Sequence, residues 1–374
     1  MVILVKFVVN KGRKMPEFKS FPKIHQFRQT IKAVTMNARY DGKGQDGEPV
    51  FNPSKPVPKL KFEGTVKLHG TNAGLIKTGH EPDGKSIYHC QSRSNNLNYP
   101  HSDNAGFGMF IHQLGQEVID DLFYSIHQFD NISIYGEWCG GNIQKNVGIN
   151  GLDKMFVIFA VRLEWENSDG PQKKWINISD LQFWSKLEKF NNLGIYYIKQ
   201  FPTFEVEIDF DNPGLIQNKL GEITLEVERE CPVAKHFGVS GGTGEGVVWS
   251  CWEEGWNSSA YTFKVKGELH SVSKVKTLAP VDIERLNTIN EFVDYCVTEN
   301  RLEQAFQATK DLHVGVDLSV KITGDFIRWV INDILSEEAD TMAENSLTNK
   351  CIGGPISKKA KNWYFSKLDK ESGL

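Results

Sequence analysis

Alternation of apolar and polar residues dominates the first two thirds of the chain. In the run KFEGTVKLHGTNAGL, Phe62, Val66 and Leu68 fall on one face and Lys67 falls on the other, as in a half-buried strand. Further segments are rich in Val, Ile, Phe, Tyr and Trp, the residues that favour strands. The pattern therefore predicts strands at 61–68, 86–92, 131–138, 155–163, 245–250 and 260–266.

Apolar residues at helical spacing interrupt these strands and then replace them. One continuous helix is predicted by residues that recur every four positions, namely Phe110, Leu114, Val118, Leu122 and Ile126. A second helix is predicted over 179–191. Beyond Lys276 two apolar stripes, 283–296 after Pro280 and 326–335 after Thr323 and Asp325, predict further helices.

This change from strand-like to helix-like spacing of apolar residues predicts three regions. Residues 1–60 read as a leader that contains a turn-rich stretch from Asp41 to Pro58. Residues 61–276 read as the main domain and residues 277–374 as a small all-helical domain. The first fourteen residues lack a small-residue cleavage site and make a poor signal peptide, although a transit peptide or a start at Met15 stays open.

Composition narrows the classes of protein that fit. The 374 residues carry a formal net charge of −4, which argues against a globally basic nucleic-acid binder but leaves room for a local basic groove. Six scattered cysteines show no zinc-like spacing, so reduced thiols in a cytoplasm-like compartment are expected. No run of 18 apolar residues occurs, and no membrane span is expected.

The predicted strands carry side chains of three chemical kinds that could meet in one place. These are cations (Lys67, Arg93, Lys264, Lys266), carboxylates (Glu137, Glu245) and an aromatic ring (Phe159). In-line displacement at phosphorus needs a nucleophile, neutralisation of phosphate charge and a divalent metal, and this mixture suits that chemistry. Each residue also has an ordinary interpretation, as a solvated strand lysine, a surface ion pair or a core ring.

The motifs carry a resemblance to a known family. The ordered set KLHGTN, QSRSN, YGEWCGGNIQKNV, FVIFAV, EGVVW and FKVKG resembles the covalent nucleotidyltransferase superfamily, and more closely the phage RNA ligases that seal nicks in duplex RNA. The resemblance covers about residues 61–276 and the helical tail more loosely. His69 favours this type of ligase, since DNA ligases and capping enzymes usually carry aspartate there.

The resemblance implies a fold and a reaction. The fold is α+β: a nucleotidyltransferase domain with ATP-grasp-like antiparallel sheets of the ligase type, then a helical domain that grips duplex RNA. Lys67 is expected to attack ATP and form lysyl–AMP; AMP then passes to an RNA 5′-phosphate, and an RNA 3′-hydroxyl displaces it. Glu137 and Glu245 are expected to hold Mg²⁺, for which Mn²⁺ can substitute.

The resemblance also implies the nucleotide contacts. Phe159 is expected to stack on adenine and Arg93 to contact the nucleotide and the RNA 5′-phosphate. The other pocket residues that it implies are Val66, His69, Gly70 and Asn72. Lys264 and Lys266, together with the metal, are expected to lower the pKa of Lys67. Ser250 departs from the family pattern, which often has a basic residue there.

Alternative functions stay open at this point. One is a DNA ligase or a GTP-dependent capping guanylyltransferase, and another is a non-catalytic nucleic-acid-binding protein with this fold. The expected partner is RNA, and the expected state is a monomer in the cytoplasm, or in the host cytoplasm for a viral protein. The tail KKAKNWYFSKLDK is either an RNA-binding patch or an ordinary amphipathic helix.

Overall fold

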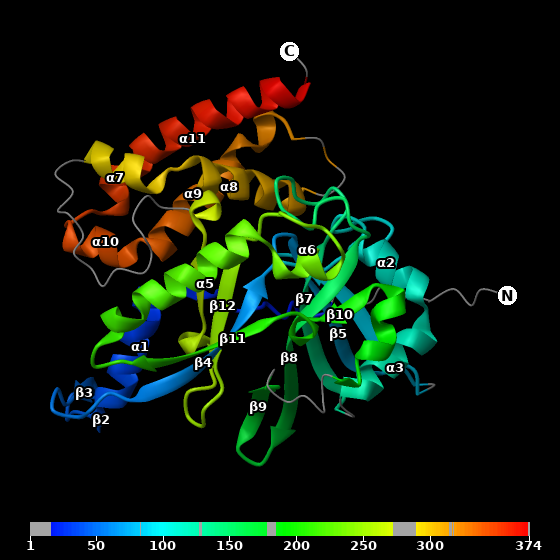
Figure 1. Ribbon diagram of the computed structural model, residues 1–374, viewed down its shortest axis with the longest axis horizontal. Coiled ribbons are helices and arrows are strands. Elements are labelled where there is room, and N and C mark those ends of the chain that lie inside the picture. The colour runs from blue at the N-terminus through cyan, green and yellow to red at the C-terminus, as the bar shows by residue number, and fades with distance from the viewer. Residues whose placement is uncertain are drawn as a thin grey trace.

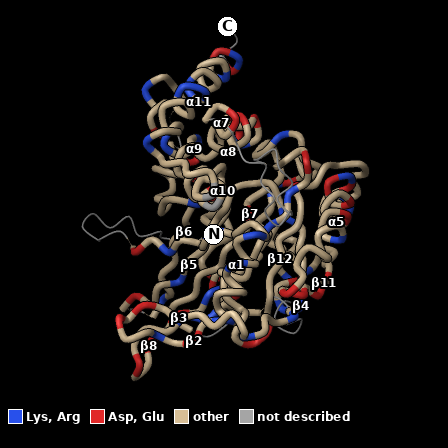
Figure 2. The backbone as a smooth tube through the Cα atoms, turned by 90° about the vertical axis from the view of Figure 1, so that its left-hand side faces the viewer, with Lys and Arg blue, Asp and Glu red and all other residues tan. Residues whose placement is uncertain are grey.

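The computed structural model describes residues 16–372, apart from residues 83, 127–128, 178–184, 272–288, 314–315 and 317. Strands occur between residues 25 and 266, and all the helices described after residue 289 lie together at one end of the molecule (Figure 1). A view turned by 90° shows the same grouping (Figure 2). The predicted combination of α and β structure is confirmed.

The first sheet joins strands that are far apart in the sequence, from residue 25 to residue 266. Its strand order is β1–β13–β12–β4–β11; β1 pairs with β13 in parallel, and the other neighbours are antiparallel. The strands are β1 (His25–Gln26), β4 (Lys59–Lys67), β11 (Thr203–Asp209), β12 (Gly246–Cys251) and β13 (Phe263–Lys266). Residues 260–262 were expected in the last strand, but Ser259–Tyr261 form a 3-10 turn.

The second sheet has the order β10–β8–β7–β5–β6, with β9 paired to β8. The strands are β5 (Thr71–His80), β6 (Ser86–Ser92), β7 (Asn131–Cys139), β8 (Met155–Asn167), β9 (Gly170–Trp175) and β10 (Ile195–Tyr197). The chain leaves the first sheet at Lys67 and enters the second at Thr71. Gly70 is required in this crossing because a Cβ there would collide with the carbonyl oxygen of Trp138.

Helices cover both sheets. The α-helices of this part are α1 (Phe27–Arg39), α2 (Phe107–Leu114), α3 (Gln116–Ile126), α5 (Gln217–Arg229) and α6 (Pro232–His236). The short 3-10 helices are η1 (Glu188–Leu193), η2 (Ile198–Gln200), η3 (Pro213–Ile216), η4 (Ser259–Tyr261) and η5 (Glu268–His270). α2 and α3 bury Ile111 and Leu122 in one core with Ile134 and Val161 of the second sheet.

Two sequence predictions in this part need correction. The single helix expected through Phe110 and Ile126 is broken at Gly115, which adopts φ +85° and ends α2. Within the stretch expected to be loop, β2 (Tyr40–Lys43) pairs with β3 (Pro49–Phe51), because a glycine-rich turn can reverse the chain into a hairpin. Of the helix expected over 179–191, residues 179–184 lie outside the described residues, and η1 occupies its end.

The helical end is built from α7 (Ile289–Cys296), α8 (Glu299–Leu312), η6 (Val320–Ile322), α9 (Thr323–Glu337), α10 (Ala339–Glu344) and α11 (Asn349–Ser372). The helix predicted over 326–335 is confirmed as α9, whereas residues 280–288 lie outside the described residues. In the tail, Tyr364 is fully buried and the Trp363 ring stacks on Phe326, 5.8 Å between centroids. These rings therefore pack the helical core and are not free platforms for bases.

No helix in the described part of the chain is both long enough and apolar enough to cross a membrane.

Candidate active site

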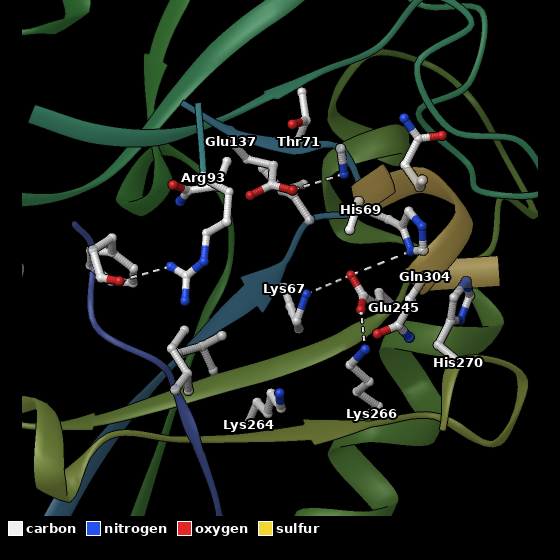
Figure 3. A pocket seen from close by; sticks show the side chains of 18 of the residues that line it. Lys67, His69, Thr71, Arg93, Glu137, Glu245, Lys264, Lys266, His270 and Gln304 are labelled. Carbon is white, nitrogen blue, oxygen red and sulfur yellow. Dashed lines mark hydrogen bonds and ion pairs between the residues drawn. The ribbon is translucent and has the colours of Figure 1, made fainter. Parts of the chain in front are cut away.

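A pocket of about 1040 Å³ opens between the two sheets and the helical end. Residues in or next to β4, β6, β7, β12 and β13 line it, and Figure 3 shows several of these side chains turned toward one another. The pocket is lined by every site residue that the sequence predicted: Val66, Lys67, His69, Gly70, Asn72, Arg93, Glu137, Phe159, Glu245, Lys264 and Lys266. Strand alternation thus delivers residues from positions 66 to 266 into one space.

Glu245 lies between two lysines of the pocket. Its Oε2 is 2.7 Å from the Nζ of Lys67, and its Oε1 is 2.9 Å from the Nζ of Lys266 (Figure 3). Burial alone would raise the pKa of Glu245, but Lys266 and Lys67 outweigh it and hold the pKa well below its ordinary value. The carboxylate is therefore ionised and shared.

This arrangement corrects the expected electrostatics of Lys67. Lys264, Lys266 and a bound metal were together expected to lower its pKa; without the metal, the two lysines do not do so. Burial does act in that direction, but the carboxylates of Glu245 and Glu137 outweigh it and raise the pKa of Lys67 above its ordinary value. Lys266 is the group whose pKa falls, to about 8, because of burial and the nearby cations Lys67 and Lys264. In the free protein Lys67 is an ammonium, and activation requires that its carboxylate partners be neutralised.

Glu137 is the second carboxylate of the site, and it is half-buried. Its Oε1 accepts a hydrogen bond of 2.9 Å from the backbone N–H of Gly70. Burial, partly opposed by Lys67, raises the pKa of Glu137 to about 7. Among the described residues no cluster of three or more His, Cys, Asp or Glu could hold a metal. The pair Glu137 and Glu245 instead fits Mg²⁺, which keeps several waters and takes one or two carboxylates.

Two histidines border the lysine–glutamate cluster. The ring centroids of His69 and His270 are 5.3 Å apart, and the Nδ1 of His69 is 3.5 Å from Glu245 Oε2. Burial lowers the pKa of His69, and burial also lowers the pKa of His270 to about 4. Both rings are therefore neutral near pH 7 and add no charge to the site.

The N-terminal segment forms one wall of the pocket. The guanidinium of Arg93 donates to the carbonyl oxygen of Phe21 at 2.9 Å, and the rings of Phe21 and Phe159 meet edge to face with centroids 5.1 Å apart. Burial lowers the pKa of Arg93. The residues that were expected to contact nucleotide therefore also contact the chain's own N-terminal segment.

Sequence reasoning missed a contact that joins three distant segments. The Nζ of Lys264 lies 3.0 Å from Oε1 of Glu337 in α9, and Lys23 and Gln26 contact the same carboxylate. Gln26 and Glu337 are 311 positions apart, so no local pattern could reveal the pair. Phe21 was missed for a related reason, because residues 1–60 read only as a leader.

Ser250 lines the pocket in β12, directly opposite Glu63 of β4. Glu63 already forms an ion pair with Lys199. Because cross-strand partners lie on the same face of a sheet, that pair places a cation beside the position where the family often has a basic residue.

Comparisons with known proteins indicate the family to which this chain belongs. A family model described as RNA ligase matches residues 60–266, more than half of the chain. Among solved structures, a Naegleria gruberi RNA ligase mutant with ATP and Mn is similar, at 14% sequence identity and a TM-score of 0.39, over 68% of this chain and 58% of that chain. Naegleria gruberi RNA ligase with PPi gives 16% identity and a TM-score of 0.38, over 68% and 57%.

This chain therefore spans less than two thirds of the length of those structures. No curated protein matches. The family model alone carries the assignment, and its residues 60–266 enclose the strands whose ends form the pocket. On that match the chain belongs to the RNA ligase family.

Proposed function

We propose that this protein is an ATP-dependent RNA ligase that works through a covalent Lys67–AMP intermediate. The observation that carries the proposal is the position of Lys67, at the end of β4, in a pocket with the carboxylates of Glu137 and Glu245 and the cations Lys264 and Lys266. Membership of the RNA ligase family supports the same reading. ATP and a divalent metal, Mg²⁺ or Mn²⁺, are the proposed cofactors.

In the first step the neutral amine of Lys67 attacks the α-phosphorus of ATP. A phosphorus–nitrogen bond forms, the bond from that phosphorus to the bridging oxygen breaks, and pyrophosphate leaves. In-line attack is favoured because the pocket fixes the amine and because lysines neutralise phosphate charge. Lys266 is suited to neutralise charge on the leaving pyrophosphate, since a pKa of about 8 lets it stay cationic near pH 7.

The carboxylates of Glu137 and Glu245 would hold the metal, whose positive charge neutralises phosphate and carboxylate charge when it is bound. With its charge neutralised, Glu245 would no longer hold Lys67 as an ammonium, since its interaction with the amine is what raises the pKa of Lys67. His69, neutral and 3.5 Å from Glu245, lines this corner without adding charge.

The second and third steps join RNA ends. AMP passes from Lys67 to an RNA 5′-phosphate, and a 3′-hydroxyl then attacks that phosphate and releases AMP. We propose a nick in duplex RNA as the substrate, on the motif resemblance and on the residues of the helical end that line the pocket, such as Gln304 and Gln307. A-form duplexes are recognised by shape and by phosphate and 2′-hydroxyl contacts, which such a neighbouring unit can supply.

The test is incubation with labelled ATP or GTP and magnesium, followed by a denaturing gel. The protein is first stripped of bound AMP with pyrophosphate. Wild type should retain label from ATP, Lys67→Ala should retain none, and Lys61→Ala should behave as wild type. Lys61 is a matched control because it lies on the same strand face but is exposed to solvent. Label from GTP alone would assign capping chemistry. No label from either nucleotide would refute the proposal that the protein is a nucleotidyl-transferring enzyme.

A further inference from the structure

A carboxylate from the helical end reaches into the pocket. Glu337, in the last turn of α9, is 3% exposed. Its Oε1 lies 3.0 Å from the Nζ of Lys264 and 3.5 Å from the Nζ of Lys23, and its Oε2 accepts a hydrogen bond of 2.7 Å from Gln26 Nε2. None of these three donors belongs to the helical end, so the anion sits in a cradle made by other parts of the chain.

The cradle is positioned by strand pairing and not by Glu337. β1 pairs with β13 in parallel, and in this register Gln26 lies opposite Lys264. Lys23 precedes β1 by two residues. The backbone ladder therefore holds the amide and one ammonium side by side whether or not a carboxylate lies between them.

The cradle also continues the row of cations that begins at Lys67. Lys264 and Lys266 lie on the same face of β13, about 7 Å apart along the strand. Lys266 shares Glu245 with Lys67. A polyphosphate chain anchored near Lys67 can follow this row from one lysine to the next.

Two ammonium groups and an amide N–H make a donor set for an anion with several oxygens. Lysine binds phosphate as a point charge, and charge-assisted hydrogen bonds to anions are the strong ones. The Glu337 carboxylate presents two oxygens to this set, as a phosphate would. Burial alone would raise the pKa of Glu337, but Lys264 and Lys23 outweigh it and hold the pKa well below its ordinary value, so the bound group is an anion.

We propose that Lys23, Gln26 and Lys264 form a phosphate subsite and that the Glu337 side chain fills it as an internal competitor when no phosphate is bound. The phosphate belongs either to the outer end of the nucleotide or to an RNA strand. This inference deepens the proposed function and rests on it for the identity of the ligand. It assigns a role to the N-terminal segment, which contributes two of the three donors.

The Glu337 side chain can leave the subsite while the helical end stays bound to α1. Arg28 of α1 donates to the Glu338 carboxylate at 3.1 Å and to the Thr341 hydroxyl at 3.2 Å. It also donates to the backbone carbonyl of Glu337. These contacts bind α1 to the helical end independently of the Glu337 side chain, so a variant at Glu337 should fold.

The experiment measures the affinity of inorganic pyrophosphate and, separately, of a nicked RNA duplex for AMP-free full-length protein in EDTA. The variants are Glu337→Gln, Glu337→Gln with Lys23→Ala, and Glu371→Gln. Glu371 is the matched control, because it also lines the pocket and loses the same charge, but its partner is Lys310 within the helical end. Calorimetry gives the dissociation constants, and thermal unfolding checks that each variant is folded.

Glu337→Gln should tighten pyrophosphate binding about tenfold, which corresponds to one modest ion pair. Lys23→Ala should remove most of that gain, and Glu371→Gln should bind as wild type does. A gain for RNA alone assigns the subsite to an RNA phosphate. Equal affinities for wild type and Glu337→Gln, or an equal gain in Glu371→Gln, would overturn the inference. Because no catalysis is measured, the subsite can stand even where the adenylylation test of Lys67 fails.

Discussion

The Nζ of Lys67 lies 2.7 Å from Oε2 of Glu245. This single contact keeps the proposed nucleophile protonated, since Glu245 contributes most to the rise in the Lys67 pKa. The same carboxylate is a proposed metal ligand. One group thus restrains the lysine in the free protein and would release it when a cation takes the carboxylate charge.

Glu245→Gln should therefore separate the two roles of this carboxylate. Adenylylation should fall about 100-fold, since the metal loses a ligand in a buried site. At the same time the pKa of Lys67 should fall, because burial remains while its nearest anion is gone. The rate at which acetic anhydride acetylates Lys67, followed by mass spectrometry near neutral pH, should rise.

Glu207→Gln is the matched control for this prediction, because Glu207 is an exposed strand glutamate of the same sheet. It should change neither rate. Full adenylylation by Glu245→Gln would show that this carboxylate is not required, and unchanged acetylation would show that it does not set the pKa of Lys67.

Metal binding should depend on pH through Glu137. Burial raises its pKa to about 7, so the carboxyl is neutral below that value and ionised above it, whereas Glu245 stays ionised. Mn²⁺ affinity should fall by about tenfold for each pH unit below about 7, since the metal must then displace a proton. Electron paramagnetic resonance titrations of free Mn²⁺ measure this dependence.

Glu137→Gln supplies the comparison for the pH dependence. It should bind Mn²⁺ weakly and with a nearly flat profile over the same range. A flat profile for wild type as well would mean that Glu137 does not take part in holding the metal.

Phe159 should determine affinity for the base and not for the phosphates. Phe159→Ala should weaken ATP binding by about tenfold or more, as expected for loss of one base–aromatic stack. Pyrophosphate, which has no base, should bind as tightly as before, and Phe159→Trp should retain most of the ATP affinity. Calorimetric titrations with the two ligands distinguish these effects, and a parallel loss of both affinities would mean that the ring only packs against Phe21.

The predicted site residues were accessible from the sequence because each one lies in a predicted strand or within a few residues of one. Alternation around Lys67 is a local property, and it survives in the first half of β4, whereas β7 buries five consecutive residues, 132–136. β5 was not predicted, since six of its ten residues are buried and five of these are consecutive, so the period of two is lost. The break at Gly115 was missed because the apolar spacing continues across it.

Contacts between distant segments could not be predicted. Glu337 meets Lys264 and Gln26 only because β1 joins β13 and α1 binds the helical end, and neither event has a local signature. The reversal of the expected Lys67 pKa shift has the same origin. It depends on which oxygen of Glu245 faces which lysine, and residue order alone does not contain that geometry.

Arg301 should be critical for the stability of the helical end. Its side chain is fully buried and bonds Asp333 at 2.9 Å and Glu338 at 3.1 Å. Arg301→Met should lower the free energy of unfolding by about 3–5 kcal/mol, because buried carboxylates lose their partner. Urea unfolding followed by circular dichroism measures the change.

Arg328→Met is the control for this prediction. Arg328 is 70% exposed and pairs with Asp325 one turn away in the same helix, so its loss should cost about 0.5 kcal/mol or less. Similar losses in the two variants would show that burial of the Arg301 network does not contribute to stability.

The parallel pairing of β1 with β13 has a consequence for the order of synthesis. His25 and Gln26 leave the ribosome early, but their partners Phe263 and Lys264 follow only after most of the chain has been made. The first sheet therefore cannot complete its edge during translation of the main domain, and contacts of such long sequence separation form slowly. A fragment that began at residue 61 would leave β13 as an open edge strand and should aggregate.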